Sequence, residues 1–251
     1  AGAWMPWAFL ADEGVRSDNR ASFALLAGAL AMSFFAGHAQ EVYYLVLILT
    51  AWKLVDSVQR WRAGQQAGCL RLLLGWILLT LVTAGLVAVD LVPISVYGQQ
   101  MVRSHGLSAA DAGAISVGLP NLLQLINPFA LGGPDAYAGR DKFFWESLCS
   151  FGIAPLILMI VGVLTSWRRH PVPRLAWTWL AAIGFAFGTG SPVFHFLVAL
   201  VPGMSLFRAP SRVLFFCSLA TAVLAGAGVD SLLAVPRTWS DRMKKLSLRT
   251  L

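Results

Sequence analysis

Residues 70–96, LRLLLGWILLTLVTAGLVAVDLVPISV, form the longest of several apolar runs in the chain. A helix needs about 20 predominantly apolar residues to cross the roughly 30 Å hydrocarbon core of a bilayer. The run is long enough, although Asp90 and Pro93 interrupt it near its end. It therefore predicts a membrane-spanning helix and makes an integral membrane protein the first hypothesis.

Shorter apolar runs on either side predict further membrane-spanning helices. They cover residues 21–37, 42–55, 148–167, 175–187 and 213–233. Together with the run at 70–96 they predict about six spans, while residues 192–201 are too short to cross and predict a half-span or an interfacial helix. No internal repeat or soluble domain is visible. The predicted fold is therefore all-α, a polytopic helical bundle forming a single transmembrane domain over residues 1–251.

The first ten residues, AGAWMPWAFL, are apolar but too short to span a bilayer as a helix. They predict the end of a helix whose beginning lies upstream. The chain is therefore expected to be an internal fragment of a longer protein, with this partial helix preceding the six spans.

Composition favours a membrane protein over the soluble classes. Hydrophobic residues make up 57% of the chain and charged residues 12%, whereas soluble globular domains carry about 25% charged residues. The net charge of +7 could indicate nucleic acid, but the basic residues lie in short clusters between apolar runs. No basic stripe with interleaved aromatic residues accompanies them, so we expect no nucleic-acid partner.

The three cysteines lack metal or redox spacing and predict core packing.

The basic residues also predict the orientation, because cytoplasmic loops of membrane proteins are enriched in Lys and Arg. Of the 19 basic residues, all but five fall on one side of the predicted bundle. The inner group includes Lys53, which lies around the connection between the second and third spans, and the basic tail at 235–251. The exceptions are Arg103, Arg140, Lys142, Arg208 and Arg212. The basic side is therefore predicted to be cytoplasmic.

The opposite, outer side is predicted to include one long segment, residues 97–145. Within it, residues 121–126 predict a short interfacial helix ended by Asn127-Pro128, and the GGPD sequence at 132–135 predicts a turn. A loop of this length between helices commonly carries function. Two shorter outer segments are predicted at 37–41 and 188–212.

The outer turn Gly37-His38-Ala39-Gln40-Glu41 places an imidazole, an amide and a carboxylate between two apolar helices. Polar groups at such a position are costly unless they are paired or solvated. One interpretation is a solvated turn in which Glu41 stabilises the start of the next helix. The other is a polar cluster, formed by His38, Gln40 and Glu41, that lines an outer cavity.

A second outer candidate is Phe207-Arg208-Ala209-Pro210-Ser211-Arg212, directly before the last predicted span. Two arginines on this side oppose the charge bias that governs insertion. A guanidinium offers a planar fork of donors that suits phosphate, and the start of the following helix would also favour an anion. The alternative interpretation is that Arg208 and Arg212 extend to lipid headgroups without a specific ligand.

Two carboxylates complete the candidates. Glu146 lies at the predicted start of the fourth span, where a carboxylate is favourable even without a function. Asp90 is predicted to be the most buried acid, acting as an ion relay or pairing with an outer arginine. The histidines have no metal-ligand spacing, so no metal site is expected within the chain. The alternative is a divalent cation that is held in part by other residues of the full protein.

The order of these features resembles the bacterial YfhO-type membrane proteins, which belong to the GT-C class of multispanning glycosyltransferases. The resemblance rests on a Trp-x-Pro element, a helix ending in Gly-His-Pro-Gln, a Glu at the mouth of a span followed by a Gly, and a Pro followed by Phe-Arg-x-Pro-x-Arg. The matching residues are Trp4-Met5-Pro6, Gly37-His38-Ala39-Gln40, Glu146 with Gly152, and Pro202 with Phe207–Arg212. Ala39 stands where the family usually has Pro, and Ser150 stands where it often has Tyr.

The resemblance implies a bacterial inner-membrane enzyme that takes a sugar from a polyprenyl-phosphate donor on the extracytoplasmic face. The acceptor would be a glycan or lipid of the cell envelope. Arg208 and Arg212 would hold the donor phosphate, and the other substrate-binding residues would be His38, Gln40, Glu41 and Glu146. The catalytic general base of this class lies early in the chain, so it is expected upstream of residue 1.

Two other functions compete with a glycosyltransferase. A transporter or flippase for an anionic lipid or solute predicts a helix broken at Asp90 and Pro93. A non-enzymatic membrane protein of envelope assembly predicts a shallow outer cavity and no effect of substitutions at His38.

Overall fold

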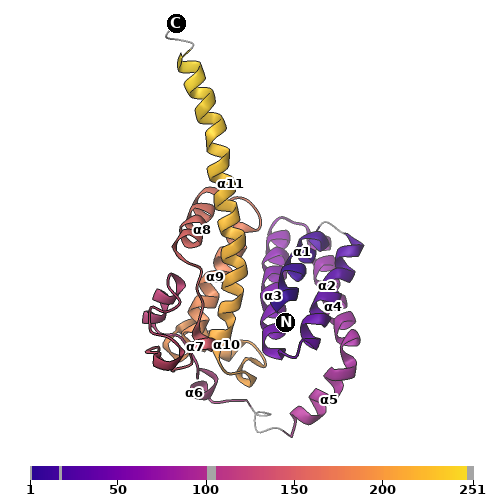
Figure 1. Cartoon of the computed structure of the whole chain (residues 1–251). Coiled ribbons are helices and arrows are strands. Elements are labelled where there is room, and N and C mark those ends of the chain that lie inside the picture. The colour runs from indigo at the N-terminus through magenta and orange to yellow at the C-terminus, as the bar shows by residue number, and fades with distance from the viewer. Residues whose placement is uncertain (1, 17–18, 101–105, 248–251) are drawn as a thin grey trace. The chain divides into compact units, whose positions relative to one another are not determined.

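The computed structural model describes residues 2–16, 19–100 and 106–247, with the backbone alone from residue 234 onward. Over these residues the fold consists of α-helices and 3₁₀-helices without a strand, so the all-α prediction is confirmed. The chain divides into two compact units, Ala1–Leu107 (unit 1) and Ser108–Leu251 (unit 2). Figure 1 shows the helices of both units. The prediction of a single transmembrane domain stays a prediction.

Unit 1 is a group of helices around a small aliphatic core. Helix α1 packs along α2, and α4 contacts both α2 and α3. Leu26, Leu30 and Leu49 are among the fully buried residues of this core. The elements are η1 (Gly2–Trp4), α1 (Met5–Arg16), α2 (Arg20–Phe35), α3 (Ala39–Arg62), α4 (Gln66–Leu86) and α5 (Ala88–Gly98).

The ends of α2 follow from local sequence. Asn19 caps its start, since the side-chain oxygen accepts a hydrogen bond from the Ala21 amide at 3.0 Å. Gly37 ends it with a left-handed backbone, φ +82°, which a glycine adopts without steric cost. Helix α3 begins two residues later, so the predicted turn between two apolar helices is present.

The apolar run at 70–96 is not one helix. Helix α4 ends at Leu86 and α5 begins at Ala88, with Val87 between them at φ −99° and ψ +6°. Pro93 lies inside α5 and cannot donate the hydrogen bond that would reach the carbonyl four residues earlier, which weakens the helix there. Asp90 is exposed in the first turn of α5. The prediction that it is the most buried acid is wrong, because Asp12 is fully buried.

Unit 2 is built around α11, which packs against α8 and α9 (Figure 1). A short helix predicted at 121–126 is present as the 3₁₀-helix η2, shifted by one or two residues, and its interfacial position stays a prediction. The elements are α6 (Ala109–Ala112), η2 (Leu119–Leu125), η3 (Pro134–Ala136), α7 (Phe144–Ser147), α8 (Ile153–Ser166), α9 (Val172–Ala186), η4 (Gly188–Gly190), α10 (Pro192–Leu200), η5 (Met204–Leu206), η6 (Pro210–Val213) and α11 (Leu214–Ser247).

Helices α8 and α11 approach so closely that their backbones touch at two glycines. A Cβ atom on Gly228 would collide with the carbonyl oxygen of Leu158, and one on Gly162 would collide with the carbonyl oxygen of Leu224. Small residues that allow such backbone approach are typical of helix contacts within membranes. The pairing of α8 with α11 therefore depends on the absence of side chains at these two positions.

Two helices in the described part of the chain are long and apolar enough to cross a membrane, Gln66–Leu86 and Pro210–Leu233. The most apolar window of Gln66–Leu86 is 11% buried and that of Pro210–Leu233 is 50% buried. An apolar helix with so little protein around it as Gln66–Leu86 is suited to a lipid environment. The remaining spans, the orientation and the type of membrane stay predictions.

Candidate functional site

The most sharply defined candidate is the arginine segment, Arg208–Arg212. Its three central residues are buried, while the arginines at both ends are exposed. Ala209 has a left-handed backbone with φ +59°, a strained conformation for a residue with a Cβ. Its amide donates to the Ala114 carbonyl at 3.0 Å, and the Ser211 amide donates to the Ile115 carbonyl at 3.4 Å. The backbone is thus fixed on both sides of Pro210 and holds two guanidiniums at the surface.

Arg212 forms a two-pronged ion pair with Glu146. Its Nε donates to Glu146 Oε2 at 2.8 Å, and one terminal nitrogen donates to Oε1 at 2.7 Å. The side chains of Arg212 and Glu146 are 40% and 32% exposed, respectively. Two of the predicted site residues therefore lie in direct contact, although 66 positions separate them.

Glu146 does not lie at the start of the fourth predicted span. It belongs to α7, a single turn, whereas α8 begins at Ile153 after Gly152 at φ +80°. The prediction that it stabilises the start of the span is wrong for this reason. Its position is set by Phe144, which packs edge-on against Tyr137 and stacks on Phe129.

The segment that precedes α7 is held by a network of buried amides. Asn121 Nδ2 donates to the Tyr137 hydroxyl at 2.5 Å, which in turn donates to Gln124 Oε1 at 2.9 Å. Gln124 Nε2 donates to the Pro128 carbonyl at 3.2 Å. Buried polar groups that satisfy one another specify a single conformation. Residues 121–137 therefore form one ordered segment, called the platform, which contacts α7 through Tyr137 and Phe144.

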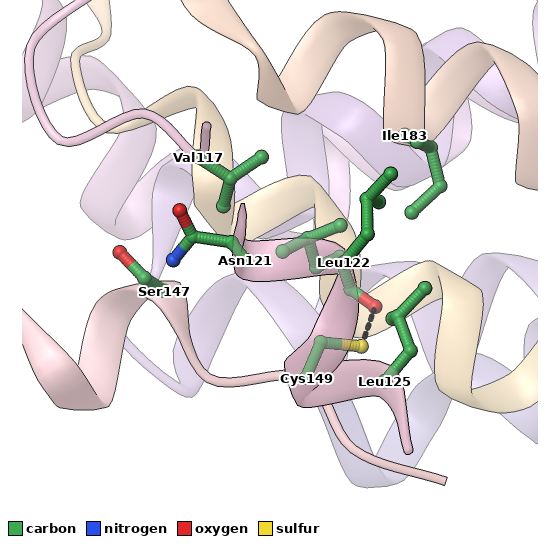
Figure 2. Close-up of a pocket in the computed structure, with 8 residues that line it drawn as sticks. Val117, Asn121, Leu122, Leu125, Ser147, Cys149 and Ile183 are labelled. Atoms are coloured by element: carbon green, nitrogen blue, oxygen red, sulfur yellow. Dashed lines mark hydrogen bonds between the residues drawn. The ribbon is translucent and has the colours of Figure 1, made fainter. Parts of the chain in front are cut away.

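A small pocket lies between this platform and the helices of unit 2 (Figure 2). Figure 2 shows Asn121, Ser147 and Cys149 among its otherwise apolar lining, with the Cys149 thiol donating to the Leu214 carbonyl at 3.6 Å. The pocket has room for about one water molecule. It is too small to hold a sugar or a phosphate.

The other three predicted site residues belong to unit 1, at the start of α3. His38 is exposed at the N-cap position and its side chain makes no capping bond. Gln40 is buried and donates to the Tyr44 hydroxyl at 2.8 Å. Glu41 is half-buried in the first turn of α3, where its charge is favourable. Gln40 thus has a structural partner, and His38 is the most accessible of the three.

The sequence interpretation missed a buried charge cluster that joins α1 to α3. Lys53 Nζ lies 2.5 Å from Asp12 Oδ1, with side chains 2% and 0% exposed. Arg16 reaches Asp56 at 3.6 Å. Lys53, counted with the basic residues around the connection after the second span, lies inside α3. The spacing of Lys53, Asp56 and Ser57 at i, i+3 and i+4, at the end of the apolar run 42–55, was the available signal.

Other candidate chemistry is sparse in residues 2–16, 19–100 and 106–247. No group of three or more His, Cys, Asp or Glu side chains there could hold a metal ion. Cys69, Cys149 and Cys217 are buried free thiols. Arg103, one of the five basic residues predicted to lie on the outer side, falls outside the described residues.

No protein family, curated protein or solved structure matches the chain. Its class is therefore set by the fold and the site alone: an all-α protein with two potential membrane-crossing helices and, at the start of one of them, a rigid segment with an exposed arginine at each end.

Proposed function

We propose that the chain belongs to a GT-C-like membrane glycosyltransferase of the YfhO type, which uses a polyprenyl-phosphate-linked sugar donor on the extracytoplasmic face. The observation that carries the proposal is the rigid arginine segment, with Arg208 and Arg212 exposed directly before α11. The proposal includes the six-span bundle, the bacterial inner membrane, the cytoplasmic position of the basic loops and an envelope glycan or lipid as acceptor.

The chemistry of this transfer needs fixed positive charge where the lipid phosphate leaves. Cationic donors that are already in place stabilise the developing charge without reorganising during the reaction. The backbone bonds of Ala209 and Ser211 supply that rigidity, and the start of a long helix adds a favourable partial charge. The general base is proposed to lie upstream of this chain, and His38, Gln40 and Glu41 are proposed to bind substrate.

The direct test is sugar transfer by the complete protein in native membranes. Arg208→Ala and Arg212→Ala should each lower transfer by at least about 100-fold, the scale seen when one transition-state donor is removed. Arg168→Ala, which removes an exposed arginine after α8, is the matched control and should leave transfer unchanged. Normal transfer by both variants of the arginine segment, at equal membrane levels, would refute the phosphate role.

A transporter or flippase is the second candidate, and the helix break at Val87 favours it. Broken helices provide backbone groups that bind substrates and ions in transporters, and Asp90 lies three residues beyond the break. If this function holds, Asp90→Asn should abolish translocation of an anionic lipid in reconstituted vesicles, while Asp135→Asn should not. Unchanged translocation in Asp90→Asn, or none in the wild type, would refute it.

A further inference from the structure

The edge of Arg212 that binds Glu146 is the edge on which a phosphate would bind with two hydrogen bonds. Nε and one terminal nitrogen present parallel donors, and both carboxylate oxygens of Glu146 accept them at 2.8 and 2.7 Å. A phosphate with two terminal oxygens would use the same pair of donors in the same geometry. The two anions therefore compete for one site.

Both side chains project from elements that are themselves fixed. Helix α7 packs against η6, with Phe144 buried on one side and Pro210 on the other. The ion pair nonetheless lies at the surface, with 40% of the Arg212 side chain and 32% of the Glu146 side chain exposed. Exchanging the carboxylate for another anion thus requires rotation of side chains and no unfolding of the platform.

Charge favours competition over joint binding. Arg208, Arg212 and Glu146 together carry a net charge of +1, and the carboxylate lies against the guanidinium that would attract the phosphate. A phosphate bound beside Glu146 would meet a like charge at close range, which opposes binding. A phosphate that displaces Glu146 would instead accept both of the donors that Arg212 now gives to the carboxylate.

We propose that Glu146 is an internal counter-anion that occupies the phosphate site of Arg212 and is displaced when a lipid phosphate binds. The inference rests on the proposed function, because it takes the arginine segment as the phosphate site. It changes the role of Glu146 from a substrate-binding residue to a competitor that lowers the affinity of the resting site. Only ligands with a two-oxygen anionic head can replace it, so Glu146 also discriminates against neutral lipids.

The test is calorimetric titration of the complete protein in detergent micelles with geranylgeranyl phosphate, inorganic phosphate and geranylgeraniol. If Glu146 occupies Arg212 for about nine-tenths of the time, Glu146→Gln should bind geranylgeranyl phosphate about 10-fold more tightly than the wild type. Glu146→Asp keeps the charge on a shorter side chain and should give a smaller gain. Glu146→Gln combined with Arg212→Gln should lose the gain, and Asp135→Asn, which removes an exposed carboxylate elsewhere, should bind like the wild type.

The probes separate the source of the phosphate. A gain with the lipid phosphate alone supports displacement by a lipid, and an equal gain with inorganic phosphate supports displacement by free phosphate. Equal binding of geranylgeraniol and its phosphate would overturn the inference, since the head group would then contribute nothing.

The inference and the proposed function can fail separately. If the wild type binds the lipid phosphate, Arg212→Gln weakens it, and Glu146→Gln binds no better than the wild type, displacement is wrong and the phosphate site stands. If neither the wild type nor Glu146→Gln binds any phosphate, both are wrong. Size-exclusion profiles of the variants that match the wild type exclude misfolding as the cause.

Discussion

In unit 1 buried charges link α1 to α3 beside a ring contact of Phe9 with Trp52, whereas in unit 2 the closest approach of α8 to α11 is made by backbone atoms. Lys53 and Asp12 are both almost fully inaccessible. Their side chains reach across the space between the two helices and pair. Gly162 and Gly228 do the opposite, since they allow the helices to meet without side chains. The two units thus represent two ways to join helices where little water is present.

The difference determines which substitutions each unit tolerates. A buried ion pair gains little net free energy, because desolvation of both charges offsets their attraction. Loss of one partner is nevertheless costly, since it leaves the other charge buried. A glycine contact contains no charge that can lose its partner. Any side-chain atom added at the glycine would, however, push the backbone of the other helix away. Unit 1 should therefore be sensitive to unmatched changes in charge, and unit 2 to added volume.

Asp12→Leu should have the largest effect on stability. It leaves the Lys53 ammonium buried without its partner, which costs about 3–5 kcal/mol in comparable sites. The loss should be measured as the free energy of unfolding of the protein in mixed micelles, titrated with a denaturing detergent.

The double variant Asp12→Leu with Lys53→Met shows whether the loss comes from the charge. Apolar replacement of both partners is often neutral or stabilising, so the double variant should return to within about 1 kcal/mol of the wild type. A double variant as unstable as Asp12→Leu would break the comparison, because the packing of α1 and not its charge would then hold unit 1 together.

Gly228→Ala is expected to have the next largest effect. Its added methyl group would strike the carbonyl oxygen of Leu158, and overpacking of this kind costs about 1–3 kcal/mol. The unfolding titration used for unit 1 would measure the loss.

Gly226→Ala is the matched control on the same helix. A Cβ there meets open space, so the substitution should be neutral or stabilise α11 by up to about 1 kcal/mol through helix propensity. Equal losses at Gly226 and Gly228 would contradict a backbone contact between α8 and α11.

The positions of the helices could be predicted from the sequence, and their ends and partners could not. Apolar runs predicted α2, α3 and the start of α11, because burial of an apolar segment leaves a local signature. The transporter hypothesis predicted a break at Asp90 and Pro93, whereas the break lies at Val87, two residues after Gly85, whose low helix propensity is only a weak signal.

For the candidate site, too, the residues could be identified from the sequence and their contacts could not. Arg208 and Arg212 stood out from the sequence because they oppose the charge bias between apolar runs. The contact of Arg212 with Glu146, and that of Lys53 with Asp12, join residues 66 and 41 positions apart. Pairing over such distances is decided by how helices pack, and the sequence of a single chain does not encode it in any local pattern.

The smallest expected effect concerns the hydroxyl groups at the end of the glycine contact. Ser231 Oγ lies 2.8 Å from Thr165 Oγ1 and 3.1 Å from Ser166 Oγ, across the α8–α11 contact. Ser231→Ala should cost about 0.6 kcal/mol, the average for such bonds between membrane helices. The loss is small because Thr165 also donates to the Val161 carbonyl of its own turn at 2.7 Å. Ser150→Ala, at an exposed loop position, should have no effect, and a Ser231→Ala loss as large as that of Gly228→Ala would mean that hydroxyls and not glycines hold unit 2 together.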